Sequence, residues 1–191
     1  MSQYTAIAEV GETLLALLRK EMTPEPISQP ELIGLSSPAQ PGELALALFL
    51  YEVRESQERQ HMMISEGTDQ LRYPPMTVNL SYLLTAHSPA EQHTRMLDEH
   101  RILGRAMQVL YDNAILRGDQ LQGSLAGMDT ELRVVVEQPP VDKLIQLFPH
   151  VPYKLSIGYS VGPVHIDSTR VRSTKRVLER DIRIRGEGDQ G

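Results

Sequence analysis

Residues 74–86 decide the fold of this chain, and their sequence is Pro74-Pro75-Met76-Thr77-Val78-Asn79-Leu80-Ser81-Tyr82-Leu83-Leu84-Thr85-Ala86. The two prolines prevent a helix from beginning before Met76, and the β-branched and aromatic residues that follow favour a strand. Successive side chains of a strand point to opposite faces. One face therefore carries Met76, Val78, Leu80, Tyr82 and Leu84, and the other carries Thr77, Asn79, Ser81, Leu83 and Thr85.

A helix is predicted after this strand, from Pro89 to about Tyr111. Ser88 is placed to cap the first free amides, Pro89 suits the first turn, and Glu91 completes a capping box. Apolar residues recur at helical spacing and predict one buried stripe: Met96, Leu103, Ala106, Met107, Leu110 and Tyr111. A strand that leads into such a helix is the nucleus of an α/β layer.

The N-terminal third is predicted to add one helix and two strands. Residues 4–22 form an amphipathic helix with a stripe of Ile7, Val10, Leu14, Leu17 and Leu18, while Glu9 and Glu12 lie largely off that stripe. Five prolines between residues 24 and 42 leave room only for a short strand at 32–35. Periodicity alone leaves residues 44–54 open between a buried helix segment and a strand, and their later alternation favours the strand. Residues 55–72 form a long surface loop or a short hairpin.

The C-terminal half is predicted to hold two more strands. After an irregular connection at 114–130, a strand covers 131–137, a short helix covers 141–148, and a strand covers 153–161. One face of this last strand carries Tyr153, Leu155, Ile157, Tyr159 and Val161. We therefore predict an α/β (α+β) fold. Its mixed, mostly antiparallel sheet has four or five strands, flanked by the 4–22 and 89–111 helices, and an extended C-terminal arm follows it.

Composition limits what the chain can do. Its 191 residues suffice for one domain with a substantial core, and without cysteine no disulfide or thiolate site can form. No apolar run approaches the roughly 20 residues that span a bilayer, and the N-terminus has no secretory signal pattern, so we expect a cytoplasmic protein. The net charge of −6 divides into −9 for residues 1–167 and +5 for residues 168–185, with −2 at the end. An acidic body with a basic tail suits self-association.

The sequence contains no recognisable catalytic or cofactor-binding motif. His93 and His100 lie seven residues apart, which is not the spacing of a zinc-binding helix, and the other histidines are scattered. The glycines of residues 186–191 fit a dinucleotide fingerprint only formally, because no strand and helix flank them, and Ser124 occupies the wrong slot for a nucleophile elbow. Asp98 and Glu99 are adjacent on the helix and are expected to face water. We expect no catalytic residue, no metal, no cofactor and no small-molecule substrate.

A family resemblance extends over residues 4–167. The residues that carry it are Tyr73-Pro74-Pro75, the run from Asn79 to Ala86, and the run from Ile102 to Asn113. In this order they resemble the N-terminal domain of the cap, or tail-terminator, proteins of phage-tail-like contractile injection systems. The resemblance implies a structural protein whose hexameric ring closes the tube and sheath at the end distal to the baseplate. Its partners would be further copies of itself, the sheath protein and the inner tube protein of the same particle. The alternative is a non-enzymatic adaptor or regulatory module that binds a partner through residues 55–72, and a cofactorless enzyme is a third interpretation.

The arm from residue 168 is the predicted interaction site of the subunit, with residues 1–167 as the cap domain. A solvated tail and a nucleic-acid contact are the other interpretations, but the arm lacks aromatic residues for base stacking, and the protein is acidic. Ile182 and Ile184 share a strand face with Arg180, so the arm can pair with the sheet edge of another subunit. The predicted interface residues are Arg170, Arg172, Lys175, Arg176, Arg180, Ile182, Arg183, Ile184 and Arg185.

Overall fold

The computed structural model describes residues 4–56, 64–65, 70–127 and 130–173. Contacts divide the chain into two units, one formed by residues 1–59 and 75–167 and the other by residues 60–74 and 168–191. No helix in the described part of the chain combines the length and the hydropathy of a membrane span.

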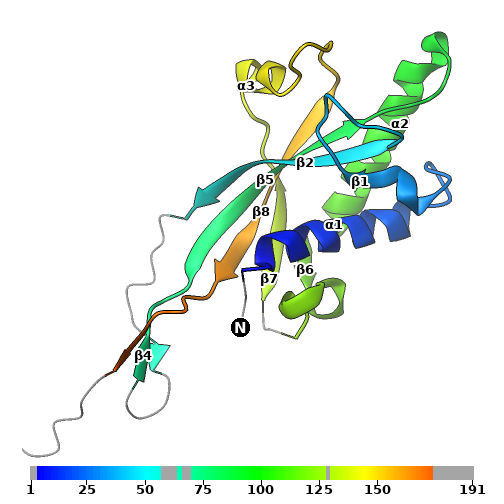
Figure 1. Cartoon of the computed structure of the whole chain (residues 1–191). Helices are drawn as coiled ribbons and strands as arrows, with labels where there is room; N and C mark the ends of the chain where they lie inside the picture. The colour runs from blue at the N-terminus through cyan, green and yellow to red at the C-terminus, as the bar shows by residue number, and fades with distance from the viewer. Residues whose placement is uncertain (1–3, 57–63, 66–69, 128–129, 174–191) are drawn as a thin grey trace, which may run out of the picture. The chain divides into compact units, whose positions relative to one another are not determined.

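A six-stranded sheet runs through the first unit (Figure 1). Its order is β1 (Ile33–Leu35), β2 (Leu46–Glu55), β5 (Met76–Ala86), β8 (Ser156–Ile166), β7 (Glu131–Val136) and β6 (Ile115–Arg117). All neighbours are antiparallel except β1 and β2. The prediction of a mixed, mostly antiparallel sheet is confirmed, with six strands rather than four or five. The additional strand, β6, lies in the stretch that was expected to be irregular.

Two helices cover one face of this sheet, α1 (Ala6–Met22) and α2 (Gln92–Asp112). The predicted inward face of β5 is confirmed, because Val78, Leu80, Tyr82 and Leu84 are at most 2% exposed. Met76 at the strand's beginning is 46% exposed instead. The core is therefore aliphatic, with the Tyr82 and Tyr159 rings inside it.

The predicted beginning of the long helix is wrong. The helix starts at Gln92, and its N-cap residue, Glu91, makes no side-chain capping bond. Ser88 Oγ instead accepts the Ala90 N–H at 3.1 Å and donates to Asp98, so a tertiary contact replaces the local capping box.

The predicted stripe of α2 is only partly right. Met96 and Tyr111 are 66% and 83% exposed, and Met107 is 40% exposed. The residues that pack are Ile102, Leu103, Ala106, Val109 and Leu110.

The opposite face of the sheet carries a smaller cluster under α3 (Val141–Gln146). Leu83 of β5 is fully buried there against Leu144 and Phe148. Tyr153 packs edge-on against Phe148, with the ring centroids 5.3 Å apart. Because β8 begins only at Ser156, the expected strand face of residues 153–161 is confirmed at Tyr159 and Val161 but not at the exposed Tyr153 and Leu155.

Short 3₁₀ turns complete the first unit. They are η1 (Pro30–Leu32), η2 (Gly118–Gln120) and η3 (Gly123–Leu125).

The second unit contains a small antiparallel sheet with the order β3-β4-β9, from β3 (Ile64–Ser65), β4 (Gln70–Arg72) and β9 (Val171–Ser173). Residues 55–72 were expected to form a long surface loop or a short hairpin, and the antiparallel pairing of β3 with β4 agrees with the second alternative. Strand β9, at the beginning of the predicted arm, pairs with β4 of the same chain, which the sequence pattern did not indicate.

Candidate interaction surfaces

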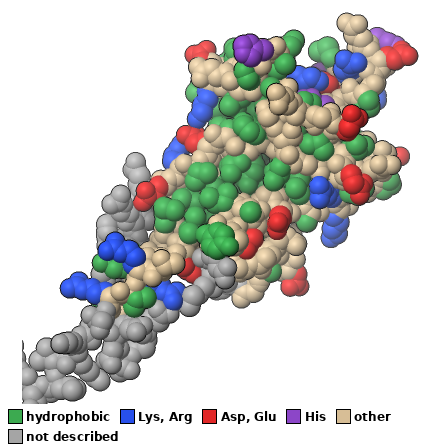
Figure 2. All heavy atoms as spheres, in the orientation of Figure 1, with side chains coloured by type: hydrophobic (Ala, Val, Ile, Leu, Met, Phe, Trp, Pro, Cys, Tyr) green, Lys and Arg blue, Asp and Glu red, His purple; other side chains and the backbone are tan. Residues whose placement is uncertain are grey.

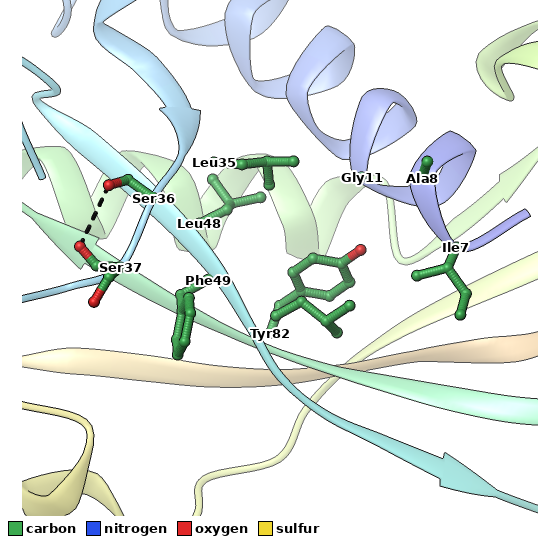
Figure 3. A pocket seen from close by; sticks show the side chains of 10 residues that line it. Ile7, Ala8, Gly11, Leu35, Ser36, Ser37, Leu48, Phe49 and Tyr82 are labelled. Carbon is green, nitrogen blue, oxygen red and sulfur yellow. Dashed lines mark hydrogen bonds between the residues drawn. The ribbon is translucent and has the colours of Figure 1, made fainter. Parts of the chain in front are cut away.

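A groove lies between α1 and the edge of the sheet, and we call it the α1–β2 groove (Figure 3). Its volume is about 370 Å³. Small residues of α1 form one wall, and β1 ends at Leu35 on another. Ser36 and Ser37 are the polar members of a mostly apolar lining: Ile7, Ala8, Gly11, Leu35, Ser36, Ser37, Leu48, Phe49, Leu50 and Tyr82. Figure 2 shows apolar side chains gathered at the centre of this face, between β2 and α1 of Figure 1.

Tyr82 forms the floor of the groove. Its side chain is 2% exposed, and no hydrogen bond to its hydroxyl occurs within the described residues. Figure 3 shows this hydroxyl pointing towards α1 at Gly11, where a Cβ, if the residue had one, would lie 3.6 Å from it. Burial raises the pKa of Tyr82 well above its ordinary value, so the group stays a neutral hydrogen-bond donor and acceptor. The groove thus ends on a polar atom that has no partner among the described residues.

A second apolar groove, the α2–β7 groove, lies near the other edge of the same sheet. Its volume is about 460 Å³, and it lies between the last turns of α2 and β7. Tyr111, Val135 and Val136 are 83%, 56% and 57% exposed there. Its lining is Met107, Gln108, Leu110, Tyr111, Ala114, Val134, Val135, Val136 and Tyr159. Exposed apolar surface of this kind is typical of protein contacts.

Both grooves occur where a three-residue outer strand ends and a longer inner strand continues. Strand β1 pairs only with Leu46–Leu48 of β2, and β6 pairs only with Glu131–Arg133 of β7. The inner strands therefore present apolar side chains beyond the last paired residue of their outer neighbours. The two grooves have different linings, so they are different surfaces of one subunit.

Buried polar contacts in the first unit are structural. The Glu9 carboxylate, which the sequence placed largely off the apolar stripe, is 8% exposed and accepts hydrogen bonds from the hydroxyls of Thr5 and Ser124, both at 2.7 Å. Burial alone would raise the pKa of Glu9, but these bonds and those from the Ser124 and Leu125 backbone outweigh it and hold the pKa below its usual value. Ser124 is thus a hydrogen-bond partner of the Glu9 carboxylate.

A second polar cluster lies where β5 leads to α2. Glu99 pairs with Lys154 at 2.5 Å and accepts the Ser88 N–H at 3.2 Å. The expectation that Asp98 and Glu99 face water is therefore wrong, because both fasten α2 to this loop. Burial and the positive charge of Lys154 lower the pKa of His87 to about 4, although the negative charge of Glu99 acts in the opposite direction. The His87 Nε2 atom has no hydrogen-bond partner among the described residues.

No group of three or more potential metal ligands occurs in the part of the chain that the structure describes. His93 is exposed beside Glu91, and His165 Nδ1 lies 3.0 Å from Thr77 Oγ1. His61 lies outside the described residues. The described histidines are thus dispersed, in agreement with their sequence spacing.

Two of the predicted interface arginines are described, and both belong to the second unit. Arg170 lies over the Tyr73 ring, 4.7 Å from its centroid, and its carbonyl accepts the Tyr73 N–H at 3.2 Å. Arg172 is paired with Leu71 in the small sheet. The other seven predicted residues lie outside the described ranges: Lys175, Arg176, Arg180, Ile182, Arg183, Ile184 and Arg185. The sequence prediction did not identify either apolar groove.

Comparison with known proteins agrees with the family resemblance. No curated protein matches the chain. Among solved structures, it is similar to the sheath/tube terminator of an extracellular contractile injection system, PVC, in the extended state, with a TM-score of 0.61 and 20% identity over 100% of this chain and 66% of that one. It is also similar to the tube-terminating cap of the anti-feeding prophage, with a TM-score of 0.56 and 19% identity over 92% of this chain and 60% of that one.

These likenesses show a shared fold, and the chain spans less than two thirds of the length of either structure. A family model describes the relationship more directly. The model for the Pvc16 N-terminal domain matches residues 9–180, which is most of the sequence. The resemblance to the cap, or tail-terminator, family of contractile injection systems is confirmed, and the chain belongs to the Pvc16 N-terminal domain family.

Proposed function

We propose that this chain is a non-enzymatic structural cap that forms a hexameric ring and closes the tube and sheath of a contractile injection particle. The observation that carries the proposal is the pair of unlike apolar grooves near opposite edges of one sheet. A cyclic ring is built from heterologous contacts, so each subunit needs two different surfaces. The similar solved structures are named as a sheath/tube terminator and a tube-terminating cap, which supports the same assignment.

The basic arm from residue 168 supplies a further contact in this proposal. Its charge is opposite to that of residues 1–167, which carry −9. Each exposed ion pair contributes only about 0–1 kcal/mol and weakens with salt, so backbone pairing has to provide most of the binding free energy. The arm would then hold a neighbouring copy or a sheath subunit in the assembled particle.

The test is assembly with the sheath and inner tube proteins of the same particle. We expect the full chain to form rings, seen by native mass spectrometry, and to stop tube growth at a defined end in electron micrographs. A chain that stays monomeric or dimeric with both partners would favour the adaptor function instead.

Two variants examine the surfaces separately. Met107→Glu places a charge in the α2–β7 groove and should reduce ring formation, whereas Met96→Glu is a matched change at an exposed position of the same helix and should not. A chain that ends at Asp167 should keep its thermal unfolding temperature, since the six-stranded sheet is complete, but should fail to cap particles. Normal capping by this truncated chain would refute the role of the arm.

A further inference from the structure

We infer that the α1–β2 groove is the acceptor for the C-terminal arm of a second copy of this chain, which adds as a strand to the outer edge of β2. The inference deepens the proposed ring function and depends on it. Three features of the first unit support it: the edge of β2, the shape of the groove and the Tyr82 hydroxyl.

The edge of β2 offers a place for another strand. Strand β1 pairs with β2 only as far as Leu48, whereas β2 continues to Glu55. Among the described residues, no strand pairs with β2 on this side beyond Leu48. An extended segment can therefore continue the line of β1 and form main-chain hydrogen bonds with Phe49 and its successors.

The groove suits one face of such a strand. Side chains of a guest strand alternate, so every second residue points to the helix-covered side of the sheet. On that side α1 contributes Ile7, Ala8 and Gly11, and the two small residues leave room for aliphatic side chains. Leu35, at the end of β1, is 53% exposed and would be covered by the guest.

Tyr82 places a polar atom in the groove. No hydrogen bond of its hydroxyl occurs within the described residues, and the hydroxyl points into the groove towards Gly11. A peptide group of a docked strand can donate to this oxygen or accept from it. The groove therefore favours a chain segment, which brings backbone amides, over a purely apolar ligand.

The chain itself contains a segment with the required pattern. Residues 180–185 are Arg180-Asp181-Ile182-Arg183-Ile184-Arg185, so Ile182 and Ile184 fall on one strand face. Three arginines and one aspartate make the net charge of this segment positive, and the acceptor unit is acidic, with Glu12 exposed one turn beyond Ala8 on α1. Because the donor segment and the acceptor groove are different surfaces, a chain of such contacts can close into a ring.

The absence of cysteine makes a direct test possible. We would prepare full-length chains with single cysteines, Ser37→Cys in the groove and Arg180→Cys in the arm, on the strand face of Ile182, and mix them under mild oxidation. We expect a disulfide between two chains in the mixture. Ser28→Cys, an exposed serine beyond the other end of α1, is the matched control and should link at least tenfold less.

Substitutions in the groove should abolish this link. Ala8→Arg fills the groove and repels the arm, whereas Ala16→Arg makes the same change at an exposed position of α1 outside it. We expect Ala8→Arg and Ile182→Asp to reduce the link between chains at least tenfold, and Ala16→Arg to leave it intact. Equal linking in all variants would overturn the inference.

The remaining outcomes separate this inference from the proposed function. Rings or capped particles without any link at Ser37 would overturn the inference and leave the cap function standing. A link that forms only within one chain, in a protein with both cysteines, would also overturn it. A link between chains that never close into rings or cap particles would uphold the groove contact and refute the ring.

Discussion

Glu9→Gln should destabilise the folded chain by about 2–4 kcal/mol at pH 7. Its carboxylate accepts hydrogen bonds from the hydroxyls of Thr5 and Ser124, and the nearby backbone of Ser124 and Leu125 further stabilises its charge. A hydrogen bond to a charged group contributes about 1.5–3 kcal/mol and a neutral one about 0.5–1.5 kcal/mol, so neutralising the acceptor costs roughly 1 kcal/mol for each bond. Glutamine also replaces one acceptor oxygen with a donor.

The site has little freedom to relax. Gly123 has φ +62°, and a Cβ added to this residue would lie 2.6 Å from Glu9 Cδ, so the backbone lies directly against the carboxyl group. This glycine provides both the left-handed conformation and the close approach. The assay is urea unfolding of the wild type, Glu9→Gln and the matched control Glu12→Gln, which is exposed on the same helix and should change stability by less than about 0.5 kcal/mol.

The pH dependence gives a second, independent check. Because folding lowers the pKa of Glu9, its contribution is present above the pKa of the unfolded chain and is lost as the pH falls through the folded pKa. The difference between wild type and Glu9→Gln should therefore shrink in acid. A variant as stable as the wild type at pH 7, or a difference that stays constant down to about pH 3, would refute the account.

Three further predictions concern the rest of the first unit. Leu84→Ala should lower the free energy of unfolding by about 2–5 kcal/mol, because Leu84 is 1% exposed in the main core. The control Leu155→Ala, at a residue that is 53% exposed, should change the free energy of unfolding little. A loss below about 0.5 kcal/mol for Leu84→Ala would mean that the environment of Leu84 is misassigned. Folding lowers the pKa of His87 from about 6.5 to about 4, so the unfolded chain binds the extra proton and the free energy of unfolding should fall as the pH drops between these values. His87→Gln should flatten this pH dependence in unfolding titrations, and an unchanged pH dependence would contradict the burial of the His87 ring. Elemental analysis should find no stoichiometric zinc, and chelation should leave the unfolding temperature unchanged, since the described residues provide no cluster of ligands.

Strong local patterns allowed most elements to be predicted. Alternation around Tyr82 and the two prolines before Met76 indicated β5 and its inward face, and helical spacing identified α1 and α2. These signals lie within short stretches of sequence, so they can be recognised without knowledge of the fold. Strand β6 has only three residues and forms through pairing with β7, which no local pattern shows.

The errors have tertiary causes. Glu9 was placed largely off the apolar stripe, but it is buried against Ser124, which lies 115 residues away in the sequence. Ser88 carries a good capping signal, yet its hydroxyl is taken by Asp98, and the helix starts later. In α2, apolar residues occupy more than one face, so packing against the sheet decides which become buried and leaves Met107 and Tyr111 for the α2–β7 groove. Neither groove could be predicted, because each depends on where a short outer strand stops.

The unequal strand lengths also explain how an open edge can be used without promoting aggregation. Strands β2 and β7 have 10 and 6 residues, whereas their outer neighbours β1 and β6 have three each, so the inner strand is longer than its outer neighbour at both edges. An exposed edge is a hazard that charged side chains reduce. On β2, Glu52 pairs with Lys143 at 2.9 Å and Arg54 lies 3.6 Å from Glu137, so charges cover the distal part of the strand. The apolar stretch at Phe49 and Leu50 lies beside the α1–β2 groove, before these charged residues. An edge restricted in this way can accept one matched segment while disfavouring indefinite strand addition, as the proposed cap function requires.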